Sequence, residues 1–211
     1  MQKAYSSQHP PKKQRSIWPL IAILLICLAP VMFALAAYYL PELGIRPSGQ
    51  NNYGKLIQPQ RPLPNSQHLT LETRDNKAVD PQQLKGKWLL ITVDGGSCDE
   101  ACVRKLFILR NSHASLGKNV RRVERIWFLT DKDTIDPTIL EAYAGTQLLQ
   151  AKPEQLAAFF TPEATNTQQA LKNKMWVIDP QGNLILEFPP DADPIRVRDD
   201  IRKLVKNSRL G

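Results

Sequence analysis

Charged residues are absent from positions 17–40, and cysteine and histidine are scarce throughout this chain of 211 residues. With only three cysteines, the chain is long enough to bury a core without disulfide staples. Its basic residues, which give a net charge of +8, are not interleaved with aromatic residues, and no nucleic-acid-binding motif occurs, so we expect no nucleic-acid partner. A charged content of 23% excludes a protein that is wholly embedded in a membrane.

The uncharged run at residues 17–40 predicts one transmembrane helix. It is long enough to cross about 30 Å of hydrocarbon at about 1.5 Å per residue. Trp18 lies at one end and Tyr38 and Tyr39 lie at the other, as in an aromatic belt, while Pro30 predicts a kink. A cleavable signal peptide ending near residues 34–36 is the alternative, but the apolar run exceeds the usual ~7–15 residues of such signals.

The flanking charges predict the orientation of this helix. Residues 1–16 form a basic tail that should remain in the cytoplasm, so the rest of the chain is translocated. We expect a protein of the bacterial inner membrane, in contact with the lipid bilayer, with its soluble domain in the periplasm. Residues 41–64 are rich in proline and glycine and predict an extended linker, followed by a soluble domain over residues 65–211.

The soluble domain alternates between apolar runs and amphipathic segments. A small hairpin is expected at residues 68–79, and a buried central strand is expected at residues 88–93, where the sequence reads WLLITV. Further strands are expected at residues 123–130, 174–179 and 184–188, and helices at residues 99–116, 138–143, 154–160 and 194–206. This order predicts an α/β fold, a three-layer α/β/α sandwich with a mixed sheet.

Cys98 and Cys102 form the cluster that carries obvious chemistry, at the turn between the central strand and its helix. Sites in open α/β sheets lie at the carboxyl ends of strands. Two fully helical residues four apart have Cβ atoms about 5–6 Å apart, whereas a disulfide needs about 3.5–4.5 Å. The pair can therefore close if Cys98 lies in the turn and only Cys102 is helical. We expect the two sulfurs to meet at an exposed mouth of the fold.

The helix N-terminus favours a thiolate here, whereas Asp99 and Glu100 oppose it, so we expect a moderately activated thiol. The translocated side of a bacterial membrane is oxidising, and a free pair there needs a reductant or a metal. Thiol–disulfide chemistry, metal binding by the two sulfurs, and a structural disulfide that clips the turn all remain open.

Several segments resemble the Sco/SenC family of membrane-anchored, thioredoxin-like proteins. These are residues 84–88 before the central strand, the CxxxC at Cys98 and Cys102, the strand and turn at residues 177–182, and the anchor with its linker. The resemblance covers about residues 84–206. It implies that the cysteine pair binds Cu(I) or exchanges disulfides with a copper-site subunit of cytochrome c oxidase.

The family's copper-binding histidine precedes the third strand, at a position near Leu171 in this sequence, and no histidine follows His113. Met175 lies close to that position, and its thioether is an acceptable soft ligand for Cu(I), so it is the candidate third ligand. We interpret His113 as an exposed helix histidine, because it lies eleven residues beyond Cys102, about 16 Å along the same helix.

Three functions therefore remain open. The first is a Sco-like assembly factor for cytochrome c oxidase that acts as a Cu(I) carrier or as a thiol–disulfide reductant of a copper site. The second is an enzyme, a general membrane-tethered thiol–disulfide oxidoreductase. The third is a non-catalytic binding module that retains the fold.

Overall fold

The computed structural model describes residues 17–39 and 52–209, which belong to two separate units of the chain. The expected cytoplasmic tail at residues 1–16 lies outside the described residues, as do residues 41–51 of the expected linker.

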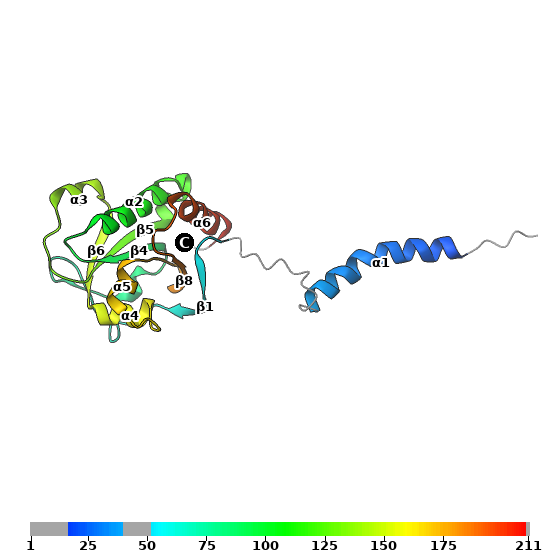
Figure 1. Ribbon diagram of the computed structural model, residues 1–211, viewed down its shortest axis with the longest axis horizontal. Coiled ribbons are helices and arrows are strands. Elements are labelled where there is room, and N and C mark those ends of the chain that lie inside the picture. The colour runs from blue at the N-terminus through cyan, green and yellow to red at the C-terminus, as the bar shows by residue number, and fades with distance from the viewer. Residues whose placement is uncertain (1–16, 40–51, 210–211) are drawn as a thin grey trace, which may run out of the picture. The chain divides into compact units, whose positions relative to one another are not determined.

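Helix α1, Trp18–Tyr39, forms the first unit (Figure 1). It contains Pro30 and has a mean hydropathy of 2.8 over its most apolar window, and none of its residues is buried. By length and composition α1 can cross a membrane. An N-terminal apolar helix was expected at residues 17–40, and this expectation is confirmed.

A mixed sheet of eight strands, in the order β1-β8-β7-β4-β5-β6-β2-β3, forms the centre of the second unit (Figure 1). The neighbouring strands β4, β5 and β6 are parallel, whereas β7, β8 and β1 extend the sheet on one side in antiparallel pairs, and β2 and β3 do so on the other. The strands are β1 Lys55–Pro62, β2 Leu71–Glu72, β3 Ala78–Val79, β4 Trp88–Asp94, β5 Val123–Leu129, β6 Thr146–Ala151, β7 Met175–Ile178 and β8 Asn183–Phe188.

Helices cover both faces of this sheet (Figure 1). Helices α2 and α6 pack on one face, against Trp88 and Leu90 of β4, and α4 and α5 pack on the other, against Leu89 and Ile91. The helices are α2 Glu100–Ala114, α3 Pro137–Ala142, α4 Pro153–Phe160, α5 Thr167–Lys172 and α6 Pro194–Asn207, with short 3-10 helices at Pro81–Leu84 and Gly117–Arg122. The three-layer α/β/α architecture with a mixed sheet is therefore confirmed.

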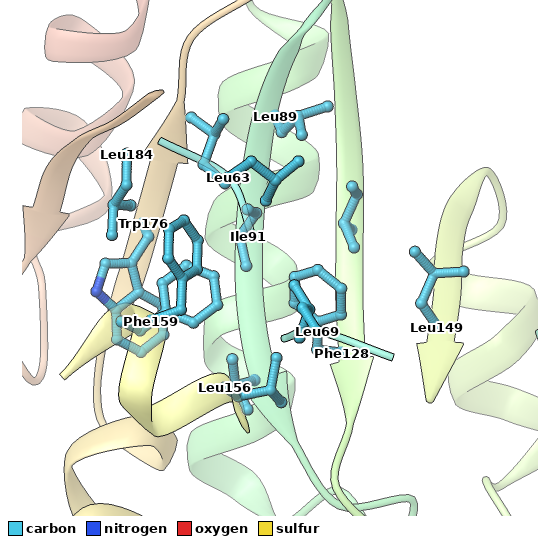
Figure 2. Packing of buried hydrophobic residues seen from close by; sticks show 14 of the residues in the cluster. Leu63, Leu69, Leu89, Ile91, Phe128, Leu149, Leu156, Phe159, Trp176 and Leu184 are labelled. Atoms are coloured by element: carbon cyan, nitrogen blue, oxygen red, sulfur yellow. The ribbon is translucent and has the colours of Figure 1, made fainter. Parts of the chain in front are cut away.

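Strand β4 is buried along its whole length because helices cover it on both faces and strands flank it on both edges. Figure 2 shows the α4 side of this core, where Ile91 lies among the aromatic rings of neighbouring elements. The rings of Phe160 and Trp176 approach to 4.6 Å between centroids, and those of Phe159 and Phe160 to 4.8 Å. Such aromatic contacts add to the free energy gained by apolar burial.

The prediction of an extended linker over residues 41–64 was wrong for the C-terminal part of that range. Strand β1 lies within residues 41–64 and pairs with β8. It is an edge strand of the sheet, and an edge tolerates Pro59 and Pro62 because one side of its backbone needs no ladder partner. Strand β6 and helix α5 were not predicted, since both are short and neither has a clear apolar period.

Candidate redox site

Cys98 and Cys102 form a disulfide at the carboxyl end of β4, with 5.1 Å between their Cα atoms. Helix α2 begins only at Glu100, so Cys98 lies in the preceding turn and Cys102 in the first helical turn. Cys98 has a φ of +38°, in the left-handed region. The prediction that the pair closes with Cys98 outside the helix is confirmed.

Asp99 explains why the helix begins where it does. It has extended backbone geometry and is the N-cap of α2, with its Oδ1 accepting a hydrogen bond of 3.0 Å from the Cys102 backbone N–H. This bond satisfies one free amide of the helix start and holds Cys102 beneath the turn. Asp99 therefore fixes the first turn of α2 between the two cysteines.

The disulfide is not at an exposed mouth, so this expectation was wrong. Cys98 is 6% exposed and Cys102 is 0% exposed. They belong to a buried cluster with Leu106 of α2, Trp127 and Leu129 of β5, and Ile135 of the following loop. The sulfurs are covered because the loop after β5 folds over the turn, a contact between segments distant in sequence.

Two glycines allow this loop to approach the turn. The Gly96 N–H donates to Asp131 Oδ1 at 2.7 Å. A Cβ added at Gly95 would lie 2.2 Å from Asp131 Oδ2, and one added at Gly96 would lie 2.2 Å from the Asp133 carbonyl oxygen. Neither glycine has a positive φ. They are therefore required here for close packing of two backbones rather than for their conformational freedom.

A buried ion pair, which the sequence analysis missed, lies at the base of the same turn. Lys105 Nζ is 2.6 Å from Asp94 Oδ2, and both side chains are more than nine-tenths buried. Lys105 also donates to the Val93 carbonyl at 3.1 Å and to the Lys172 carbonyl at the end of α5. It thus joins the end of β4, helix α2 and helix α5 around the turn that holds the disulfide.

Burial dominates the electrostatics of this pair. Desolvation raises the pKa of Asp94, while Lys105 partly opposes the rise, and desolvation lowers the pKa of Lys105, while Asp94 partly opposes the fall. The sequence did contain a signal for this ion pair. Lys105 lies three positions after Cys102, on the apolar side of the helix, where a buried charge is costly unless a partner of opposite charge compensates it.

The candidate third copper ligand lies elsewhere. Met175 is buried in the cluster that joins the sheet to α6, separate from the cluster that holds Cys98 and Cys102. His68 is exposed and bonds to Asn65. Among residues 17–39 and 52–209, no group of three or more His, Cys, Asp or Glu side chains could hold a metal ion. The potential soft-metal ligands that the structure brings together are the sulfurs of Cys98 and Cys102.

His113 is not an exposed helix histidine, so that interpretation was wrong. It is half-buried, and its Nε2 lies 3.1 Å from the Val123 carbonyl oxygen. Desolvation lowers the pKa of His113, and the positive charge of Arg125 lowers it further. His113 helps to hold α2 against the start of β5.

Known proteins share the fold that carries this disulfide. Residues 88–208 match the family model described as transmembrane-like, thioredoxin-like, C-terminal domain. The chain is similar to the apo Sco1 protein from Thermus thermophilus, with 20% identity, a TM-score of 0.55, and coverage of 74% of this chain and 99% of that one. It is also similar to a protein from Aquifex aeolicus VF5, with 18% identity, a TM-score of 0.51, and coverage of 70% and 98%.

These similarities confirm the thioredoxin-like fold that the Sco/SenC resemblance implied. No curated protein matches the sequence.

Proposed function

Because the chain belongs to the transmembrane-like, thioredoxin-like C-terminal domain family, we propose that it is a membrane-anchored, Sco-like assembly factor. Its Cys98/Cys102 pair would act as a thiol–disulfide reductant toward a copper-site subunit of cytochrome c oxidase. The observation that carries this proposal is the disulfide at the strand-to-helix turn, with one cysteine in the turn and the other in the helix. The resemblance of the sequence to the Sco/SenC family supports the choice of client.

The exchange has two steps. The Cys98 thiolate attacks one sulfur of the client disulfide, forming a mixed disulfide and releasing the other client sulfur as a thiolate, which takes up a proton. The Cys102 thiol then loses its proton and attacks Cys98 Sγ, which releases the second client thiolate and closes the Cys98–Cys102 disulfide. Two electrons pass to the client, and a dithiol donor in the same compartment restores the reduced pair.

The difference in burial between the two cysteines supports separate roles for them. Cys98 is the more exposed and therefore the attacking residue, whereas Cys102 is fully buried and resolves the mixed disulfide from within. Helix α1 would anchor the domain in the bacterial inner membrane, and the basic residues before it support a periplasmic location for the pair.

Carriage of Cu(I) by the reduced pair is the second candidate. It is favoured by the proximity of two soft sulfur ligands, which could bind one Cu(I) between them. Copper would then be cargo that passes to the client.

A non-catalytic binding module is the third candidate. The near-complete burial of both sulfurs favours it, because a structural disulfide that clips a turn needs no access to a client.

Disulfide exchange with a defined client separates these functions. The reduced full-length chain in detergent would be mixed with an oxidised copper-site domain of the oxidase subunit, and the thiols of both would be counted by maleimide labelling. We expect one client disulfide to be reduced for each disulfide formed at Cys98–Cys102. Cys102→Ser should accumulate a mixed disulfide at Cys98, and Cys98→Ser should neither reduce nor trap the client.

Other outcomes would contradict the reductant role. If the client stayed oxidised while anaerobic titration showed one Cu(I) bound by the wild type and none by Cys98→Ser, the carrier function would replace it. If neither reaction occurred and Cys98→Ser with Cys102→Ser still supported oxidase assembly in cells, the binding module would remain.

A further inference from the structure

The loop after β5 shields the disulfide from solvent. We name residues 131–135 the cover segment; it connects β5 to α3 and is without helix or strand. Its last residue, Ile135, is buried in the cluster that contains Cys98 and Cys102. The cover segment therefore contributes an apolar side chain to the cluster that buries the disulfide.

Asp131 fixes the start of the cover segment on the turn that holds the disulfide. Its Oδ1 accepts a hydrogen bond of 2.7 Å from the Gly96 N–H, two residues before Cys98. The same oxygen accepts a bond of 3.1 Å from the Asp133 N–H within the cover segment. One carboxylate oxygen thus ties together the turn and the segment that covers it, through hydrogen bonds to an ionised acceptor.

The opposite side of the cover segment borders empty space. An open pocket of about 300 Å³ is lined by Leu129 to Lys132, by Thr70 and Glu72 at β2, and by residues 150–153 at the end of β6. In the sheet, β4 lies on one side of β5, whereas β6 and β2 lie on the other. The segment after β5 therefore has the disulfide turn on its β4 side and the pocket on its β6 side, and the pocket offers room into which the segment can move.

We propose that Asp131 is a positioning residue of the redox site, holding a displaceable cover over Cys98 and so deciding which thiols reach the disulfide. This inference rests on the proposed thiol–disulfide function. When the Asp131–Gly96 bond opens, the cover segment moves toward the pocket and exposes Cys98 Sγ to the attacking thiol. A client that binds at this edge of the sheet could displace the cover, whereas a small thiol must wait for spontaneous opening.

The test measures the rate at which dithiothreitol reduces the disulfide of the full-length chain in detergent. Maleimide labelling of the free thiols at successive times gives this rate. Asp131→Ala removes the bond to Gly96, and we expect the rate to rise about tenfold, the size of effect that losing one charge-assisted hydrogen bond gives. Asp131→Asn retains an oxygen acceptor and should lie between wild type and Asp131→Ala. The matched control, Asp133→Asn, removes an equal charge from the same segment and should change the rate by less than about twofold.

Gly96→Ala gives an independent test, because its added Cβ would meet the Asp133 carbonyl oxygen at 2.2 Å and should force the cover away. Hydrogen exchange separates opening of the cover from general loosening of the domain. In Asp131→Ala, exchange at the Gly96 amide should rise, whereas exchange at the amides of Ile91 and Phe128 in the central strands should not change.

Equal reduction rates in wild type, Asp131→Ala and Gly96→Ala would overturn the cover proposal. A faster rate accompanied by faster exchange throughout β4 and β5 would also overturn it, since Asp131 would then have a general structural role. The rate with dithiothreitol does not depend on any client. A confirmed cover in a chain that serves no client would therefore refute the proposed function alone.

Discussion

Replacing Lys105 with methionine removes the only cation that the structure brings to Asp94 at ion-pair distance among the described residues. Methionine fills much of the space of the lysine stem, so the change acts chiefly on charge and hydrogen bonding. It deletes the ion pair of 2.6 Å and the two hydrogen bonds to the carbonyls of Val93 and Lys172. The Asp94 carboxylate, which is 3% exposed, is left in the protein without its counter-charge.

The expected cost is large because a buried charge has lost its partner. Removing one member of a buried ion pair typically costs about 3–5 kcal/mol. For a domain of this size that corresponds to a fall in melting temperature of roughly 10 °C, at about 2–4 °C per kcal/mol. The double variant Asp94→Asn, Lys105→Met removes the unpaired charge and should recover at least half of the lost stability.

The decisive assay measures the free energy of unfolding as a function of pH, by urea unfolding under non-reducing conditions. Desolvation already raises the pKa of Asp94 above its ordinary value of 3.8, and Lys105 opposes this rise, so the pKa rises further in Lys105→Met. A carboxyl group with a raised folded-state pKa favours the folded state more as the pH falls through that pKa. The stability gap between wild type and Lys105→Met should therefore be largest at about pH 7 and narrow toward pH 5.

A gap below about 1 kcal/mol at neutral pH would refute the argument that burial makes this pair indispensable. A gap that stays constant with pH would refute the assignment of the cost to an ionised Asp94. The same single variant should also loosen the turn that holds the disulfide, because Lys105 joins β4 to α5 at its base.

Three other measurements test separate parts of the structure. Ile91→Ala should cost about 2–5 kcal/mol in urea unfolding because Ile91 is 0% exposed in the central strand, whereas Phe107→Ala, at 52% exposure, should cost less than about 0.5 kcal/mol. Because burial lowers the pKa of His113 below 6.5, the unfolded chain binds this proton more readily, so stability should decrease as the pH falls below about 7; this part of the decrease should disappear in His113→Gln. Reduction of the disulfide should increase tryptophan emission, since Trp127 packs in the same cluster and a neighbouring disulfide quenches indole fluorescence; Trp127→Phe should abolish the change.

The sequence predicted the elements that have strong local patterns. WLLITV is apolar throughout and forms the fully buried strand β4, and Asp193 followed by Pro194 marks the start of α6. The position of the cysteine pair was equally clear, because it follows directly from where β4 ends and α2 begins. Strand β1 was not predicted, because its proline content is typical of a linker and only its pairing with β8 makes it a strand.

The environment of the disulfide could not be predicted for a similar reason. Apart from Leu106 of α2, the buried residues that share the cluster with Cys98 and Cys102 come from β5 and the cover segment, about thirty positions later in the chain. Local periodicity carries no information about such distant contacts. The adjacent Gly95 and Gly96 were the one local signal. Their lack of side chains is what lets the cover segment pack against them.

Reversible reduction of the Cys98–Cys102 disulfide in the folded, full-length chain tests the central claim most directly. The chain would be equilibrated in detergent with dithiothreitol buffers of known potential, with thiols trapped by maleimide and folding followed by circular dichroism. A working thiol–disulfide pair should show a reversible two-electron transition above about −300 mV, with the fold intact in both states. A disulfide that stays oxidised below about −300 mV, and opens only when the domain unfolds, would contradict the account.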